Sequence, residues 1–263
     1  MSTTSDTPTI TLRLNDKGPA VRRLQVCLHE LGYLKPKPDG KFGVVTEFAV
    51  LSFQNTRNLI CDGIVGPATW AALLPAKAGL LAVKPAVSSS FADWLVTIAK
   101  RDVGNVETLR NNQGAWIKKF WPSTSYPDGY SNREPYCAAA MSYWLDTAGD
   151  DLAKAGLLQS LTGMDAEKFE KWRCKSAGAW AWQGWGQKAK GVTVLPDTAM
   201  PQKGDIVVFD FSHIGLVIGQ PAISRIVTIE ANTGPAGERD GDGCWEKNRP
   251  QEIAKCFLRF NFA

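Results

Sequence analysis

The stretch Asn132-Arg133-Glu134-Pro135-Tyr136-Cys137-Ala138-Ala139-Ala140 predicts a loop that delivers a cysteine to the first turn of a helix. Pro135 suits the first helical position, the alanines favour helix, and apolar residues continue to Gly149, which would end it. Unpaired backbone N–H groups and the positive end of the helix dipole stabilise a thiolate there, which is the nucleophilic form of cysteine. Because most cysteines are small buried hydrophobic residues, Cys137 becomes a candidate nucleophile only if the chain supplies its partners.

The composition is that of an ordinary globular protein that is long enough for two domains. The chain has 263 residues, of which 44% are hydrophobic and 21% charged. Its formal charge of +4 suits anionic polymers such as nucleic acid, acidic lipid or bacterial cell wall. No run of Lys and Arg is interleaved with aromatic residues, and no zinc-finger or helix-turn-helix pattern occurs, so nucleic acid is not an expected partner.

The amino-terminal sequence and the cysteines indicate where the protein is made. Residues 1–7 lack the basic and apolar regions of a signal peptide, and no stretch approaches the roughly 18 apolar residues of a membrane span. We therefore expect synthesis in the bacterial cytoplasm without a signal peptide, and no membrane insertion. Six cysteines without a CxxC pair favour reduced thiols over a disulfide framework or a zinc site, although Cys27 and Cys61 could pair after export.

An internal repeat organises the first part of the chain. Asp39-Gly40-Lys41-Phe42-Gly43-Val44-Val45-Thr46 aligns with Asp62-Gly63-Ile64-Val65-Gly66-Pro67-Ala68-Thr69, and each copy predicts a tight turn that leads into a helix. A further helix is predicted over residues 18–31, where Val21, Leu24, Leu28 and Leu31 form one apolar stripe before Gly32. Three short helices around one small core are expected.

These motifs, together with Phe53-Gln54 and Thr69-Trp70, closely resemble the three-helix peptidoglycan-binding domain over residues 14–75. The resemblance implies that this domain binds bacterial peptidoglycan and directs an attached hydrolase to it. Residues 1–13 are then an amino-terminal tail. Residues 76–90, with their proline residues and a serine triplet, are predicted to be a linker.

Residues 91–263 predict an α+β domain. Helical patterns come first, at residues 91–98 and 115–121 and after Cys137, and a tryptophan-rich region follows. Three apolar strands are then predicted at residues 204–209, 214–219 and 225–232. This order favours an antiparallel sheet packed against the cysteine helix.

The second domain contains a single histidine, His213, at the start of the second predicted strand. The third strand places Thr228, Glu230 and Asn232 on one face, because side chains alternate along a strand. A thiolate nucleophile needs a base, and the base needs a third group that fixes its tautomer. Cys137, His213 and Glu230 are predicted to fill these roles, with Asn232 orienting the imidazole as well or instead.

Four segments resemble the CHAP domain, the cysteine and histidine dependent amidohydrolase/peptidase: Pro135-Tyr136-Cys137-Ala138 and residues 204–209, 213–217 and 229–233. The resemblance covers residues 91–263 and implies a compact papain-like fold that cleaves amide bonds in peptidoglycan, with Cys137, His213, Glu230 and Asn232 in the site. Some family members bind calcium before the cysteine, but here Asp128 and Glu134 are too few acids to predict it. No metal and no cofactor are expected.

Other signals are weaker. The tryptophans at positions 172, 180, 182 and 185 fit packing against the sheet better than a ligand groove. The acidic segment 238–243 lacks the spaced ligands of an EF-hand and is interpreted as a turn, and one histidine is too few for a zinc amidase. His29 is expected to have an incidental role.

The sequence thus predicts a modular, monomeric peptidoglycan hydrolase with a wall-binding domain and a cysteine amidase or endopeptidase domain. A phage endolysin, which acts on the wall after release, is the favoured setting. A secreted antibacterial effector has the same chemistry, and a wall-binding protein without catalysis is the alternative from another class. The scissile bond stays open between amidase and endopeptidase.

Overall fold

The computed structural model describes residues 10–57, 59–60, 62–78, 90–109, 111–235 and 241–262. The chain divides into two compact units, residues 1–89 and 90–263. Cys61, most of the predicted tail and linker, and part of the acidic segment lie outside the described residues, so the expectations for them remain predictions. None of the described helices has the length and apolar character that a membrane crossing requires.

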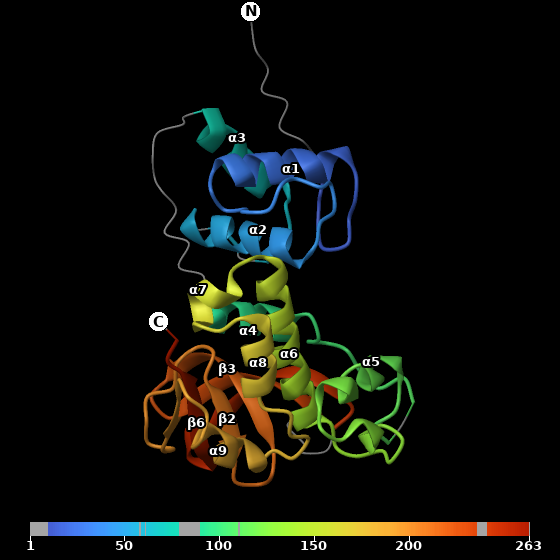
Figure 1. Ribbon diagram of the computed structural model, residues 1–263, viewed down its shortest axis with the longest axis vertical. Helices are drawn as coiled ribbons and strands as arrows, with labels where there is room; N and C mark the ends of the chain where they lie inside the picture. Colours follow the sequence, from blue (N-terminus) through green and yellow to red (C-terminus); the bar gives the residue numbers. More distant parts are fainter. Residues whose placement is uncertain are drawn as a thin grey trace, which may run out of the picture. The chain divides into compact units, whose positions relative to one another are not determined.

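The described residues of the first unit form three helices, α1 (Pro19–Glu30), α2 (Val44–Thr56) and α3 (Pro67–Ala78) (Figure 1). The apolar stripe of α1 is buried as predicted, except that Leu31 caps the helix and is only partly buried. Gly32 follows with a φ of 79°, a left-handed conformation that ends the helix. Phe53 and Trp70 belong to the same core and are fully buried. Helix α3 runs to Ala78, and thus into the predicted linker.

The two repeats are built around two buried glutamines. Gln25 Nε2 donates to Asp39 Oδ1 at 2.8 Å, while its Oε1 accepts from the backbone N–H groups of Asp39 and Gly40. In the second copy Gln54 Nε2 donates to Asp62 Oδ1 at 2.9 Å and Oε1 accepts from Gly63 N–H. A side-chain amide therefore supplies the hydrogen bonds that close each Asp-Gly turn.

The second unit is an antiparallel sheet with helices, in the α+β order that was predicted. The helices are α4 (Phe91–Lys100), α5 (Ala115–Lys118), α6 (Cys137–Lys154), α7 (Leu158–Thr162), α8 (Ala166–Trp172) and α9 (Ala181–Gly186). Short 3-10 helices are η1 (Trp121–Ser123), η2 (Pro127–Gly129) and η3 (Gln251–Ile253). The strands are β1 (Val192–Leu195), β2 (Ile206–Phe209), β3 (Ile214–Ala222), β4 (Arg225–Thr233), β5 (Gly243–Pro250) and β6 (Ala254–Phe260).

The six strands run in the order β1-β6-β2-β3-β4-β5, and every neighbouring pair is antiparallel. All four residues of β2 are buried, since this strand lies inside the sheet. Helix α6 packs against β3 and β4 and against α4 and α8 (Figure 1). The cysteine at the start of α6 is thereby brought to the two strands that carry His213 and Glu230.

Two predictions about α6 are wrong. The helix begins at Cys137, so Pro135 precedes the N-cap residue Tyr136 and does not occupy the first helical position. The helix also continues through Gly149 to Lys154. A Cβ at Gly149 would lie 2.2 Å from the Phe169 ring, so this glycine allows α8 to pack closely and does not end the helix.

Candidate active site

Cys137 lies at the positive end of a long helix. The first intrahelical hydrogen bond joins Ala140 N–H to the Tyr136 carbonyl at 2.8 Å, so the N–H groups of Cys137, Ala138 and Ala139 precede it. The three alanines that follow Cys137 are fully buried and allow the strands to approach this end of α6. Cys137 itself is buried, with 6% of its surface exposed. Cys137 therefore lies near the positive end of the helix dipole, in a position that is largely shielded from water.

His213 is held at the start of β3 by a tight turn and two aromatic rings. The turn has Ser212 at a φ of 59°, and the His213 carbonyl accepts from Phe209 N–H at 2.9 Å. The imidazole stacks on Phe209 and Phe211, with ring centroids 5.9 and 5.8 Å away. Only 1% of the residue is exposed. These contacts restrict the imidazole to one orientation.

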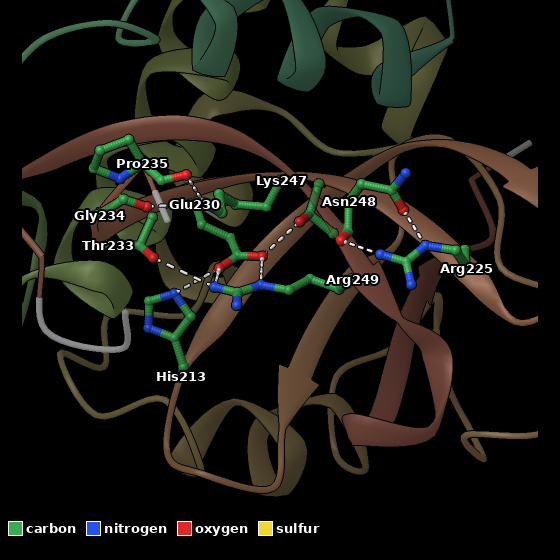
Figure 2. Close-up of polar contacts among 10 residues, drawn as sticks. His213, Arg225, Glu230, Thr233, Gly234, Pro235, Lys247, Asn248 and Arg249 are labelled. Carbon is green, nitrogen blue, oxygen red and sulfur yellow. Dashed lines mark hydrogen bonds and ion pairs between the residues drawn. The ribbon is translucent and has the colours of Figure 1, made fainter. Parts of the chain in front are cut away.

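Glu230 on β4 is completely buried and is the centre of a dense hydrogen-bond network. Its Oε2 lies 3.1 Å from His213 Nε2, and its Oε1 accepts from Thr228 Oγ1 at 2.6 Å. Arg249 on β5 donates from Nε to Oε1 at 3.0 Å and from a terminal nitrogen to Oε2 at 2.6 Å. Figure 2 shows the Arg249 guanidinium lying along the carboxylate, while the His213 ring reaches the same carboxylate.

The protonation states follow from these contacts. Burial acts to lower the pKa of His213, but interactions with Cys137 and Glu230 outweigh it and raise the pKa to about 9. Burial acts to raise the pKa of Glu230, but hydrogen bonds and charges from His213 and Arg249 lower it to about 2. At neutral pH an imidazolium therefore lies beside an ionised carboxylate and interacts with the Cys137 side chain.

Asn232 has a different place from Glu230. Its Oδ1 accepts from Tyr136 N–H at 3.4 Å, next to Cys137. Asn232 has a φ of 59°, and the register of β4 against β5 shifts between Ala231 and Thr233, so the strict alternation of the strand ends here. Of the two side chains considered for orienting the imidazole, Glu230 is within hydrogen-bond distance of it, whereas Asn232 binds the backbone at the start of α6.

Arg249 was not predicted as a site residue, because the sequence pattern does not indicate strand β5. The run from Cys244 to Arg249 has no continuous apolar character, although Lys247 and Arg249 alternate with Asn248 on one strand. One chemical signal was present: a buried carboxylate needs several donors, and a single histidine does not supply them.

The remaining predictions concern tryptophans, His29 and metals. Trp182 is fully buried, and Trp172 and Trp185 are partly buried and pack on each other, whereas Trp180 is 50% exposed and donates to the Phe209 carbonyl at 3.1 Å. His29 Nδ1 lies 2.7 Å from the Leu34 carbonyl, in keeping with an incidental role. Within the described part of the chain, no three His, Cys, Asp or Glu side chains are grouped so that they could hold a metal ion.

Comparison with known proteins connects the first unit to the cell wall. The family model described as a putative peptidoglycan binding domain matches residues 17–73. The protein is therefore peptidoglycan-related and carries a peptidoglycan-binding domain in its first unit.

Two relatives are similar over part of the chain. An uncharacterised protein from the bpoA1 3′ region of Kitasatospora aureofaciens is 49% identical over 63 residues, which are 24% of this chain and 53% of that protein. A probable N-acetylmuramoyl-L-alanine amidase of Bacillus licheniformis is 39% identical over 79 residues, which are 29% of this chain and 22% of that protein. The matched segments thus span about half the length of the first relative and about a fifth of the second.

Proposed function

We propose that the protein is a peptidoglycan hydrolase in which a CHAP-like, papain-type domain cleaves an amide bond with Cys137 as nucleophile. The observation that carries this proposal is the arrangement of Cys137, His213 and Glu230. The imidazole interacts with the thiol and lies 3.1 Å from a fully buried carboxylate. The peptidoglycan-binding domain on the same chain and the similarity to a probable amidase support the cell wall as the substrate.

The proposed reaction starts from an ion pair, because a His213 pKa of about 9 implies that the imidazole has already accepted the Cys137 proton at neutral pH. Because Nε2 faces Glu230, we assign this transfer to Nδ1. The thiolate attacks the amide carbonyl, and the backbone N–H groups at the start of α6 stabilise the oxyanion. The imidazolium then gives its proton to the leaving amine, which departs and leaves a thioester on Cys137.

Hydrolysis of the thioester restores the enzyme. Neutral His213 takes a proton from water, the hydroxide attacks the thioester carbonyl, and the imidazolium returns the proton to the departing sulfur. Glu230 stabilises each imidazolium through its contact with Nε2. Asn232 has a separate role in this scheme, because its bond to Tyr136 N–H holds the chain that enters α6.

A lysis experiment with matched cysteine variants tests the proposal. Purified wild type should solubilise peptidoglycan, whereas Cys137→Ala should still bind sedimented wall but lose lysis by at least about 100-fold, as expected when a nucleophile is removed. Cys174→Ala is the control, because burial raises the pKa of that thiol to about 11 and keeps it protonated. Equal lysis by wild type and Cys137→Ala would overturn the mechanism.

Mass spectrometry of the released fragments identifies the bond. Free glycan chains with intact stem peptides would define an amidase, and shortened stem peptides an endopeptidase. Both settings considered from the sequence, phage endolysin and secreted effector, use this chemistry. Neighbouring genes distinguish them, since a holin gene indicates a phage and an immunity gene an effector.

A further inference from the structure

Arg249 makes the most extensive contact with the Glu230 carboxylate. Its Nε reaches Oε1 at 3.0 Å and a terminal nitrogen reaches Oε2 at 2.6 Å, so the two planar groups are joined at both oxygens. We propose that Arg249 is a positioning residue for the proposed reaction, whose guanidinium fixes the Glu230 carboxylate so that Oε2 faces His213 Nε2. This inference rests on the proposed roles of Cys137 and His213.

The geometry of the carboxylate gives the physical reason. A glutamate side chain rotates about several bonds, and the Thr228 hydroxyl holds only one of its two oxygens. A paired guanidinium sets the plane of the whole carboxylate, because its N–H groups form a rigid fork. Oε2 then keeps one lone pair directed at His213 while it accepts from Arg249 through another.

Contacts with two aromatic rings and a threonine hydroxyl fix the position of the Arg249 guanidinium. Its guanidinium lies 5.9 Å from the Phe209 ring centroid and 6.0 Å from that of Phe211, the same two rings on which His213 stacks. The terminal nitrogen that binds Glu230 also lies 3.3 Å from Thr233 Oγ1. With 11% of its side chain exposed, Arg249 shares one low-dielectric environment with the imidazole and the carboxylate.

The charged and titratable groups around this pair come from three directions. His213 at the start of β3 faces Glu230, and Cys137 at the start of α6 interacts with His213. On β5, Lys247 is directed elsewhere, because its Nζ donates to the Gly234 and Pro235 carbonyls at 2.8 Å. The buried Cys244 thiol lies on the same strand. Its pKa is raised chiefly by burial, and the charge of Glu230 raises it further.

Loss of Arg249 has a defined consequence for the nucleophile. Without the guanidinium, burial favours the protonated form of Glu230, and a protonated carboxyl no longer stabilises the imidazolium. The thiolate of Cys137 then loses part of its counter-charge and forms only at higher pH. A purely structural role would lower stability without moving this pH dependence.

The test is the pH dependence of Cys137 alkylation by iodoacetamide in the full-length protein, followed by mass spectrometry of the Cys137 peptide. For Arg249→Gln we expect the midpoint to move upward by about one pH unit and the rate at pH 6 to fall about tenfold. Arg249→Lys should give a smaller shift, since an ammonium keeps the charge but not the fork. Circular dichroism establishes that each variant is folded.

Arg259→Gln is the matched control. Arg259 also binds a buried carboxylate at both oxygens, that of Asp205, at 3.0 and 2.7 Å in the same sheet. Its removal should leave the alkylation profile unchanged. The proposal would be overturned if folded Arg249→Gln kept the wild-type pH dependence of alkylation, or if Arg259→Gln shifted it equally. If Arg249→Gln does not fold, a wild-type pH dependence in Arg249→Lys would overturn the proposal.

Alkylation needs no peptidoglycan, and this separates the two proposals. A wild type that fails to lyse the wall but shows the Arg249-dependent profile contradicts the proposed function and supports the role of Arg249. If the wild type lyses the wall but replacing Arg249 leaves the pH dependence of alkylation unchanged, only the role of Arg249 is contradicted.

Discussion

Replacement of Gly215 by alanine should displace the Glu230 side chain and thereby weaken its contact with His213. Gly215 lies on β3 beside Glu230, and a Cβ there would be 2.9 Å from Glu230 Cγ and 3.4 Å from the Ile229 carbonyl oxygen. The Glu230 side chain must move by about 0.5 Å to restore ordinary contact in this packed interior. It has no free space for this movement, because it is fully buried and held by four hydrogen bonds.

The size of the movement determines the result. The His213 to Glu230 contact is 3.1 Å, and a further displacement of about 0.5 Å would bring it to a distance at which it no longer counts as a hydrogen bond. We expect Gly215→Ala to lose about 1–3 kcal/mol of unfolding free energy through overpacking. Lysis should fall at least about tenfold, since a misplacement of about 1 Å in a catalytic site costs about 100-fold.

Denaturant unfolding and peptidoglycan solubilisation, measured on the same preparations, check both values. Gly219→Ala on the same strand is the matched control, because an added Cβ there has no atom within 4 Å. It should retain activity and be as stable as wild type or slightly more, as alanine is favoured over glycine in a strand. If Gly215→Ala matches Gly219→Ala in stability and lysis, the reasoning about the Glu230 environment is refuted.

From the ionisation of Glu230 and His213, the second unit should be most stable between about pH 4.5 and 6.5. The pKa of Glu230 is lowered from 4.5 to about 2, so its contribution to stability is present above pH 4.5 and is lost as the pH falls toward 2. The pKa of His213 is raised from 6.5 to about 9, so its contribution is full below pH 6.5 and is lost as the pH rises through 9. Urea unfolding across this range should show both slopes, and a flat profile would contradict these ionisation states. In the first unit, Gln25→Ala should lower stability by about 2–4 kcal/mol, because the turn groups that bind both ends of the amide lose their partner. In calorimetry of the full chain, only the unfolding temperature of the first unit should fall. An unchanged unfolding temperature would be evidence against the role of this glutamine.

The parts of the site that the sequence predicted are those governed by local pattern. His213 and Glu230 lie on consecutive strands of clear apolar character, and such strands pair as neighbours in an antiparallel sheet. Cys137 was predicted from the loop and alanine run that begin its helix. The contact between Asn232 and the start of α6 was not predictable, because it depends on a local break in strand alternation.

Long-range register explains what the sequence did not predict. Strands β5 and β6 mix charged and apolar residues without strict alternation, and β1 has only 4 residues, so their pattern is weaker than that of the central strands. Arg249 reaches Glu230 only because of the register in which β5 pairs with β4. Gly149 shows the same limit for helices, since its role depends on a phenylalanine in another helix and not on its own neighbours.

Strand β5, which carries Arg249, is at the edge of the described sheet: its neighbouring strand is β4, and residues 104–107 form backbone hydrogen bonds at its start. Edge strands detach at a lower free energy than central ones, because fewer hydrogen bonds and contacts must be broken together. Brief fraying of β5 would therefore remove the counter-ion of Glu230 while the central strands and α6 stay folded. Heating should therefore inactivate the proposed enzyme at a lower temperature than the one at which the second unit unfolds as a whole.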